Sequence, residues 1–417
     1  MWDRRGVQRA WLALVLFGTG TAPSAAQEAL SLQQAIDRAV GSRASLKAEG
    51  ERIGAAEGLR QQAGAWPNPE FQFQNDNLRP GQTYSREVET LAFVVQPLDV
   101  LGKHGRRVEA AEHTVTRTRA EYDLARARVV RDVKLAYWAA RGAQEARNLL
   151  NTTVENFQKI VDYNNAQLSV GTIAEQDVLR VRLEGERLAI AASLAALRAS
   201  RAQADLLLQM GEDSGSELQL TEPLDAGDTA ARSVLTEQVL TERPEMKIAR
   251  AAVDEARAHV RLQDALARPD LTLTYGYKRT PLPDAPSGAN TAIAAVAITL
   301  PLFDRNRGNR AAAAADARRQ DQLLTATRLD VLSEYRAASQ EYALRRSEVV
   351  GPLQRMREHA ATISSIARAV YVQTGGDLLR LLDAERSRLD AEMAWVEGMV
   401  DYQQSIVNLE AAAGVVR

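Results

Sequence analysis

The sequence predicts a mainly α-helical protein with a small β part, built from one structural unit that occurs twice. Three observations support this fold class: an internal repeat, two pairs of short alternating strands, and two helices of unusual length. Three segments of the first half recur in the second, namely AWPNPEFQFQ (65–74) at 266–275, QPLDVLGKHGRR (96–107) at 300–310, and LSVGTIAEQDVL (168–179) at 371–382. The shift is 200 residues from Pro69 to Pro269 and 204 from Pro97 to Pro301. A shift that drifts so little indicates a duplicated unit with small insertions.

The chain divides into a secretion signal, two repeats and a connector. Residues 1–26 combine three arginines, a short apolar run and the small residues Ser24, Ala25 and Ala26, a pattern typical of a secretory signal peptide. We place the first repeat at 27–215, a polar connector at 216–236 and the second repeat at 237–417. The net charge is −2 and there is no cysteine. These values argue against a nucleic-acid partner and exclude disulfides, thiolate metal sites and a lipid anchor on cysteine.

Each repeat is expected to run helix, strand, strand, long helix, turn and returning helix. The first helix covers Leu30 to Ala63, with Ser31 as its N-cap, and a Pro-Asn-Pro segment ends it. Strands follow at about 70–78 and 89–98, and in the second repeat at about 270–279 and 291–302. The Pro- and Gly-rich residues 280–290 predict a loop between the last two. Alternation gives each strand one apolar face: Phe71 and Phe73; Leu91, Phe93 and Val95; Leu271, Leu273, Tyr275 and Tyr277; Val296, Ile298, Leu300 and Leu302.

The strands alone leave two interpretations open. Strands of about 9–11 residues with one apolar face are typical of a transmembrane β-barrel, yet a soluble hairpin shows the same pattern. A membrane barrel must close, single-chain barrels begin at about eight strands, and this chain offers four. Either the sheet lies outside a membrane, or several chains share one barrel. In the second case Phe93 is expected on the lipid face.

The two longest helices predict a protein that spans a distance. No helix breaker interrupts 106–170, which at about 1.5 Å per residue would reach on the order of 95 Å. Apolar and small residues recur along both helices at alternating spacings of four and three, a coiled-coil pattern that Arg147, Asn164 and Arg346 interrupt. Turns at 169–177 and 372–377 then reverse the chain into Ala-rich returning helices.

The paired motifs resemble the outer-membrane factor family, whose best-known member is TolC, over about 30–409. PNPEFQFQND, QPLDVLGKHGRRVEAA and LPLFDRNRGNRAAA are similar to its heavy-metal efflux branch, the cobalt-zinc-cadmium and copper-silver resistance channels. The resemblance implies a homotrimer located in the outer membrane of a Gram-negative cell. Each chain would give four strands to a shared twelve-stranded barrel in outer-membrane lipid, and the long helices would form a tunnel through the periplasm. It also implies two partners, a periplasmic adaptor (membrane fusion) protein and a proton-driven inner-membrane efflux pump.

On this resemblance the protein is a passive outer-membrane exit duct for metal cations, with the pump supplying the energy. The sequence holds no catalytic constellation, cofactor motif or metal-ligand spacing, and its four histidines are scattered, so neither an enzyme nor a cofactor is expected. Two other functions stay open. One is an exit duct for drugs, small organic molecules or type I secreted proteins. The other is a periplasmic coiled-coil adaptor or scaffold, against which the duplicated strand pairs argue.

Candidate functional residues lie at the two turns that end the long helices. Rings of carboxylates attract cations in a pore, and the candidate periplasmic gate comprises Glu175, Asp177, Asp377, Arg380 and Asp383. In the family, aspartates before an apolar pair ring the tunnel entrance; Asp177 matches this position, but Arg380 occupies it in the second repeat. We therefore predict a mixed ring of Asp177 and Arg380, whereas Asp377 could instead N-cap the returning helix. The candidate adaptor-docking turns are Gly171, Gly375 and Gly376.

Overall fold

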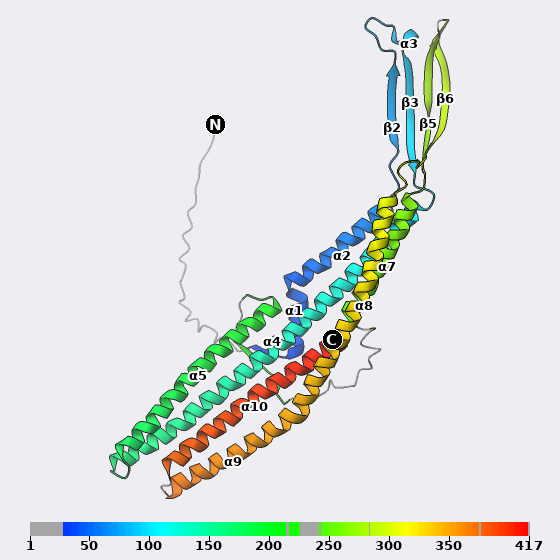
Figure 1. Ribbon diagram of the computed structural model, residues 1–417. Coiled ribbons are helices and arrows are strands. Elements are labelled where there is room, and N and C mark those ends of the chain that lie inside the picture. The colour runs from blue at the N-terminus through cyan, green and yellow to red at the C-terminus, as the bar shows by residue number, and fades with distance from the viewer. Residues whose placement is uncertain are drawn as a thin grey trace, which may run out of the picture.

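The computed structural model describes residues 28–213, 217–225, 241, 243–282, 284–374 and 377–415. The predicted signal peptide, 1–26, lies outside the described residues. The molecule is elongated: a four-stranded sheet stands at one end, two helical hairpins reverse at the other, and the helices run between them (Figure 1). None of the helices in these ranges combines the length and the apolar character needed to cross a membrane.

The two halves of the chain contain similar series of elements. The first half comprises β1 (Glu28–Leu30), α1 (Leu32–Ser42), α2 (Ala44–Ala63), β2 (Glu70–Asp76), α3 (Tyr84–Glu87), β3 (Glu89–Leu98), α4 (Lys103–Ser169), α5 (Glu175–Met210) and β4 (Leu218–Leu220). The second comprises α7 (Pro244–Leu266), β5 (Asp270–Leu282), β6 (Ala285–Thr299), α8 (Arg307–Leu344), η1 (Arg345–Val350), α9 (Gly351–Thr374) and α10 (Leu378–Ala413). Both halves therefore place a pair of strands between a short helix and a long one.

The N-terminal helix is broken, contrary to the single helix predicted over 30–63. Ser31 starts α1 with a capping box, as predicted, but Arg43 is extended (φ −61°, ψ 114°) and separates α1 from α2. The break lets this segment bind the end of α5, where the Ser42 hydroxyl donates to the Met210 carbonyl (2.6 Å). A contact with a helix distant in sequence thus overrides the local helical pattern.

The described part of the predicted connector, 217–225, contains the short strand β4. β4 pairs in parallel with β1, a small sheet that the sequence did not predict. The hydroxyl of Tyr137 joins this pair to α4: it donates to the Leu30 carbonyl (3.0 Å) and accepts from the Thr221 amide (3.2 Å). Tyr137 is fully buried in the largest apolar core, with Val133, Leu206 and Met210. The polar composition of the connector hid a strand that this core holds in place.

The four strands at the end of the molecule form one antiparallel sheet in the order β2-β3-β5-β6. Val94 of β3 pairs with Phe71 and with Tyr275, and directly paired residues share a face. The apolar face therefore carries Phe71, Phe73, Ala92, Val94, Leu271, Leu273, Tyr275, Tyr277, Ala292, Ala294, Val296 and Ile298. Phe93 lies on the opposite face, paired with Gln72 and Gly276. Its predicted place on the apolar face of the sheet is wrong, and Val94 takes that place.

Strand lengths differ from the prediction, above all in the second repeat. β5 continues to Leu282 and β6 begins at Ala285, so most of 280–290 is strand, contrary to the predicted loop. A bulge between Thr280 and Leu282 and a φ of +67° at Gly288 accompany this extension. The last strand spans 285–299 rather than 291–302, and the first ends at 76 rather than 78.

The two long helices differ in continuity. α4 runs unbroken over 67 residues, whereas the π-helical turn η1 separates α8 from α9. A π turn inserts extra backbone into the helical repeat, and Arg346, which interrupts the predicted seam, lies within it. The helix bends there (Figure 1) and Arg345 donates to Asp401 of α10 (2.8 Å). Just beyond the bend, Leu353 packs so closely on Gly398 that a Cβ atom at that glycine would clash.

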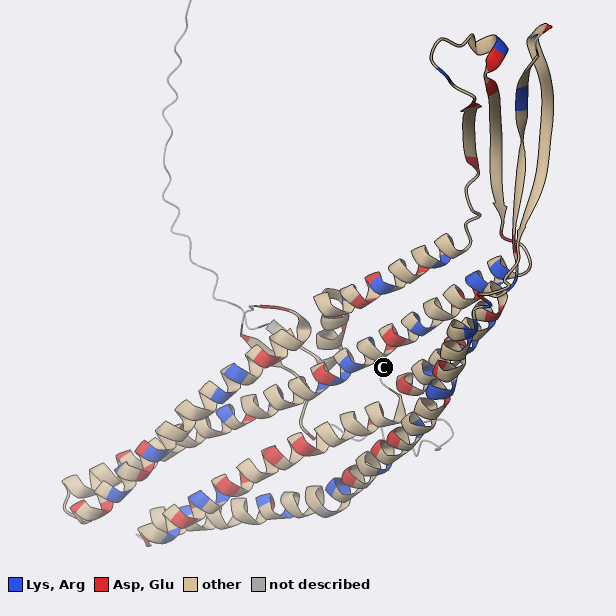
Figure 2. Cartoon of the chain, turned by 45° about the horizontal axis from the view of Figure 1, so that its top comes forward, with Lys and Arg blue, Asp and Glu red and all other residues tan. Residues whose placement is uncertain are grey.

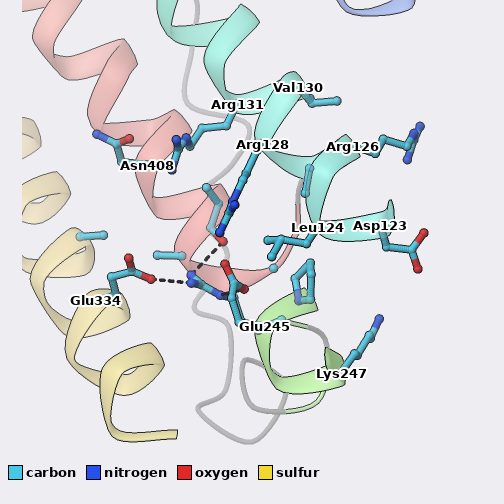
Figure 3. Close-up of a pocket in the computed structure, with 17 residues that line it drawn as sticks. Asp123, Leu124, Arg126, Arg128, Val130, Arg131, Glu245, Lys247, Glu334 and Asn408 are labelled. Atoms are coloured by element: carbon cyan, nitrogen blue, oxygen red, sulfur yellow. Dashed lines mark hydrogen bonds and ion pairs between the residues drawn. The ribbon is translucent and has the colours of Figure 1, made fainter. Parts of the chain in front are cut away.

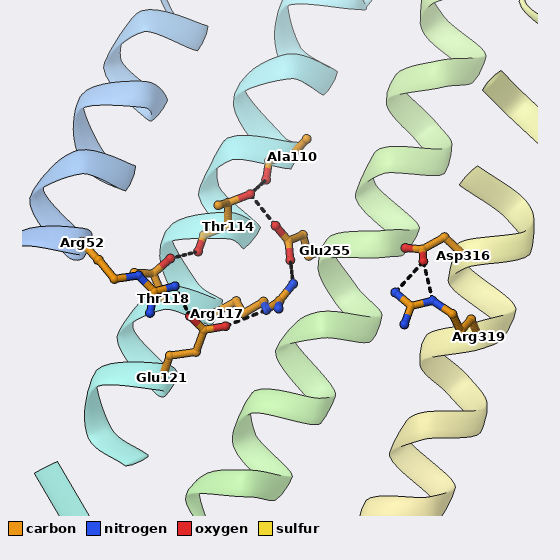
Figure 4. A network of polar contacts seen from close by, with 9 residues as sticks. All are labelled: Arg52, Ala110, Thr114, Arg117, Thr118, Glu121, Glu255, Asp316 and Arg319. Carbon is orange, nitrogen blue, oxygen red and sulfur yellow. Dashed lines mark hydrogen bonds and ion pairs between the residues drawn. The ribbon is translucent and has the colours of Figure 1, made fainter. Parts of the chain in front are cut away.

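A chain of ion pairs links three helices on the sheet side of the molecule. Arg117 of α4 lies 3.0 Å from Glu121 on the same helix and 3.0 Å from Glu255 on α7 (Figure 4). The Thr114 hydroxyl also donates to Glu255 (2.6 Å), and Arg52 of α2 reaches Glu121 (2.7 Å). These contacts fix α2, α4 and α7 side by side below the strands.

Candidate gate at the helical tips

The candidate gate residues lie where the two helical hairpins reverse, at the end of the molecule opposite the sheet (Figure 1). Glu175 is the exposed first residue of α5, and Asp177 is half-exposed one residue before the buried Val178. Gly171 has a φ of +74°, which a residue with a side chain adopts only with strain, and the space around it is open. Gly375 and Gly376 lie outside the described residues.

The second turn carries charges that contact one another weakly. Asp377 N-caps α10, because its carboxylate accepts from the Leu379 amide (2.9 Å). Arg380 is 87 % exposed and its guanidinium lies 3.9 Å from Asp377, and such exposed pairs contribute about 0–1 kcal/mol. Asp383 is exposed on the next turn. Within the described chain Asp177 and Arg380 form no ion pair, so their mixed ring across copies stays a prediction.

A buried polar contact joins the two hairpins near these turns. The Tyr371 hydroxyl of α9 donates to the side-chain oxygen of Asn164 on α4 (2.6 Å), and the Asn164 amide donates to the Ile160 carbonyl (2.7 Å). Asn164 is fully buried, and the ring of Tyr163 meets that of Tyr371 edge to face at 6.0 Å. Burial raises the pKa of Tyr371, and the carboxylate of Asp177 adds to this rise. The hydroxyl is therefore protonated at neutral pH and donates a hydrogen bond to Asn164.

An ion pair joins the same hairpins a few turns away. Arg386 of α10 donates through Nε to Glu184 of α5 (2.8 Å) and makes a second bond from Nη2. The Glu184 side chain is only 10 % exposed, whereas that of Arg386 is 52 % exposed. The hydrogen bond from Arg386 lowers the pKa of Glu184, and burial opposes this. Two polar contacts, Asn164–Tyr371 and Glu184–Arg386, thus join the first and second repeats beside the apolar packing of the hairpins, and we call this pair of contacts the tip clamp.

Glu385 braces the second hairpin internally. Its buried carboxylate accepts from the Ser364 hydroxyl (2.9 Å), from Arg368 (2.6 Å) and from Arg388 (3.2 Å). Burial alone would raise the pKa of Glu385, but the bonds from Arg368 and Ser364 lower it overall. Arg388 also approaches the Thr153 hydroxyl of α4 at 3.5 Å. Thr153, Ser364, Arg368 and Arg388 line a groove of about 600 Å³ between α4 and α9.

Acid is expected to weaken the tip clamp. The folded-state pKa of Glu184 is lowered, so its contribution is complete above the ordinary value of 4.5 and is lost as pH falls through the lowered value. Because Arg386 is half-exposed, we expect only about 1 kcal/mol from this pair. The gap in thermal stability between wild type and Glu184→Gln should therefore close as pH falls below 4.5. A gap that stays constant down to pH 3 would contradict this role.

The sequence did not predict the residues of the tip clamp. Asn164 was visible only as a polar interruption of the apolar seam of the long helix. A single buried asparagine in such a seam commonly fixes the pairing of helices, and this signal could have found it. Glu184 and Arg386 carry no comparable signal, because charges at spacings of three and four are common on solvated helices.

A second cavity, of about 440 Å³, lies midway along the molecule where α7 begins and α10 ends. Arg243, almost fully buried, bonds there to Glu245 (2.9 Å), to Glu334 and to the Ala411 carbonyl (3.1 Å). Figure 3 shows Glu245 and Glu334 in this cavity. The donors of Arg243 are thus engaged by the protein itself. We assign this cluster a structural role, joining α7, α8 and α10.

A long rod of paired coiled-coil hairpins, clamped at one end and carrying a sheet at the other, is the architecture of an outer-membrane channel subunit. The outer membrane efflux protein family matches residues 35–212 and 235–415, and the chain belongs to this family. It therefore acts in the outer membrane as a component of efflux.

Relatives and solved structures agree with this assignment. The cobalt-zinc-cadmium resistance protein CzcC of Cupriavidus metallidurans is 25% identical over 402 residues, covering 95% of this chain and 94% of that protein. The nickel-cobalt-cadmium resistance protein NccC of Alcaligenes xylosoxydans is 25% identical over 362 residues, covering 80% and 74%. A crystal structure of the MtrE outer membrane channel of Neisseria gonorrhoeae has a TM-score of 0.76 at 21% identity, covering 92% of this chain and 88% of that one. A structure of CusC has a TM-score of 0.74 at 20% identity, covering 92% and 91%.

Proposed function

We propose that this protein is the outer-membrane channel of a tripartite efflux system that expels metal cations. The observation that carries the proposal is the match to CzcC, a cobalt-zinc-cadmium resistance protein, over 95% of the chain. The channel itself is passive. A proton-driven inner-membrane pump supplies the energy, and a periplasmic adaptor joins the pump to the helical tips.

The sheet supports assembly into a trimer. Among the described strands, β2 pairs only with β3 and β6 pairs only with β5, so both edges of the sheet are open. Open edges cannot be solvated by lipid. Three copies, each giving four strands, would close a barrel of twelve, with the apolar face turned to lipid.

The helices support the same assembly. Contacts place them in the order α5, α4, α10 and α9 near the tips, so α5 and α9 form opposite flanks (Figure 1). Each flank exposes large apolar side chains at helical spacing: Leu183, Ile190, Leu194 and Leu197 on α5, and Met356, Ile363, Ile366 and Val370 on α9. Because the two flanks differ, one copy's α9 would meet the next copy's α5, a head-to-tail contact that closes into a ring.

The tips support a gate and a docking surface. In the trimer we place Glu175, Asp177, Asp377, Arg380 and Asp383 around the tunnel entrance. We also place Gly171 and the pair Gly375 and Gly376 at the surface that meets the adaptor. Opening would require the two hairpins of each chain to separate, and the tip clamp opposes that separation.

A deletion strain tests the proposal. Loss of the gene should lower the tolerated concentration of cobalt, zinc or cadmium, and re-expression of the full chain should restore it. Native mass measurement of the detergent-extracted protein should show three copies. Unchanged tolerance to all metals together with sensitivity to drugs would favour the drug-efflux alternative. Recovery of a soluble periplasmic monomer would favour the adaptor or scaffold.

A further inference from the structure

Exposed apolar side chains lie in the segments that join the sheet to the helices. Phe303 is completely exposed, and Leu300 and Leu302 are each more than 60 % exposed. Val100 and Leu101 are exposed at the corresponding turn of the first repeat, and Trp66 is exposed in the segment that leads from α2 into β2. We call these six residues the collar. Phe303 is the most exposed of the six, and Trp66 is partly covered by the ring of His104. Large apolar side chains gathered on a surface indicate that it is covered in use.

The backbone holds parts of the collar outward at a conformational cost. Leu101 has a φ of +59°, a left-handed conformation that leucine rarely adopts. The Arg268 guanidinium donates to the Leu101 carbonyl and fixes this turn. Strain of this kind at an exposed apolar residue points to a function for its position rather than to packing.

The collar begins where the apolar face of the sheet ends. Leu300 follows Val296 and Ile298 at the same alternate spacing, directly after β6 ends at Thr299. The chain then turns, because the Leu302 amide donates to the Leu300 carbonyl (2.9 Å). On the proposed function that face meets the hydrocarbon of the outer membrane. The collar then lies at the level where acyl chains give way to headgroups on the periplasmic side.

Positive charge adjoins the collar. Most ionic side chains of the junction are paired within the chain: Lys103 with Asp270 (2.5 Å), Arg310 with Asp264 (2.5 Å), and Arg107 with Asp99. The exposed Arg305 and Arg307 have no carboxylate partner among the described residues. The one acid between them and Phe303 is Asp304, whose carboxylate accepts from the Asn306 amide (2.9 Å). Figure 2 shows Lys and Arg gathered where the helices begin.

We infer that the second-repeat part of the collar, Leu300, Leu302 and Phe303, binds anionic phospholipids together with Arg305 and Arg307, on the periplasm-facing surface of the outer membrane. The inference rests on the proposed membrane placement of the sheet. Phe303 and Leu302 would lie among the acyl carbons nearest the headgroups. Arg305 and Arg307, two and four residues after Phe303, would bind the lipid phosphate through their guanidinium groups. In the first repeat the residue equivalent to Arg307 is Lys103, which forms an ion pair with Asp270 and is therefore not free to bind a lipid phosphate. Each chain therefore carries one such lipid site, in its second repeat.

Quenching by brominated lipid tests this site in nanodiscs that hold the full chain. Phe303→Trp, in a Trp66→Phe background, serves as the reporter. Matched discs contain an equal minor fraction of brominated phosphatidylglycerol or of brominated phosphatidylcholine. We expect several-fold stronger quenching by the anionic lipid, on the order of fivefold for each arginine. Arg305→Gln with Arg307→Gln should remove the preference.

The matched control removes the same charge further down the same helix. Arg318 and Arg328 are exposed on α8, about 16 Å and about 32 Å beyond Arg307. Arg318→Gln with Arg328→Gln should keep the preference for phosphatidylglycerol. Equal quenching by both lipids in the reporter protein would overturn the inference and leave the channel function standing.

A second reporter separates failure of the site from failure of the membrane placement. Tyr275→Trp puts the fluorophore on the apolar face of the sheet, away from the collar. Quenching of Trp at 275 but not at 303 would place the collar outside the bilayer and overturn the inference alone. Absence of quenching at both positions would overturn the proposed membrane function itself.

Discussion

Arginine in place of Val94 is expected to prevent stable assembly in the membrane, whereas arginine at the next residue, Val95, is expected to be tolerated. Val94 is 43 % exposed and lies on the apolar face between Phe71 and Tyr275. A charge on the lipid face near the middle of a bilayer costs about 2–4 kcal/mol, and a trimer would bear this cost three times. Val95 pairs with Glu70 and Thr274 on the polar face, where a guanidinium has water and a carboxylate nearby.

The fraction of each variant recovered as membrane-embedded trimer measures the difference. We expect little or none for Val94→Arg and nearly the wild-type amount for Val95→Arg. The same substitution in adjacent residues controls for size, charge and strand propensity. Equal loss in both variants would mean that neither face of β3 contacts lipid, and loss only in Val95→Arg would reverse the assignment of faces.

This pair of residues also shows what the sequence could predict about the sheet. Alternation gave the apolar face of β2 and of β5 correctly, because Phe71, Phe73, Tyr275 and Tyr277 stand between polar residues. β3 is apolar on both faces, so its alternation carries no information on which face meets water. Only the register resolved it, because Val94 pairs with Phe71 of β2 and with Tyr275 of β5, which is 181 residues away.

The helices show the same division between local and distant information. The length of α4, the cap at Ser31 and the N-terminus of α10 at Asp377 follow from local patterns, and the structure has each of them. The break at Arg43 and the π turn at Arg345 do not. Both occur where a side chain reaches another helix, Ser42 to α5 and Arg345 to α10. Sequence periodicity describes one helix at a time and gives no information on contacts between helices.

The predicted gate residues lie at the turns of the two hairpins, and different residues join the hairpins to each other. Exposed charges such as Arg380 are conspicuous in a sequence, yet in the structure their contacts are weak. The stronger contact is buried and neutral. A hydrogen bond between Asn164 and Tyr371, 207 residues apart, has no spacing that a single sequence could reveal.

Removing the Tyr371 hydroxyl is expected to favour the open channel. In Tyr371→Phe the side-chain oxygen of Asn164 stays buried without the bond that now satisfies it. An unsatisfied buried acceptor costs about 1–3 kcal/mol. If the hairpins separate on opening, water reaches Asn164 in the open state, and the cost falls on the closed state alone. Open probability should then rise about 5- to 150-fold, measured as the fraction of time spent open in single-channel recordings in a planar bilayer.

Tyr163→Phe provides the matched control. The Tyr163 ring touches that of Tyr371, but its hydroxyl accepts a bond from Gln167 on the same helix (3.1 Å). This variant loses a tyrosine hydroxyl a few ångströms away without losing a bond between the hairpins, so its gating should match wild type. Equal gating in all three proteins would show that the Asn164–Tyr371 bond is kept when the channel opens. In that case the two hairpins of one chain move together, and the entrance must open at the contact between α5 and α9 of neighbouring copies.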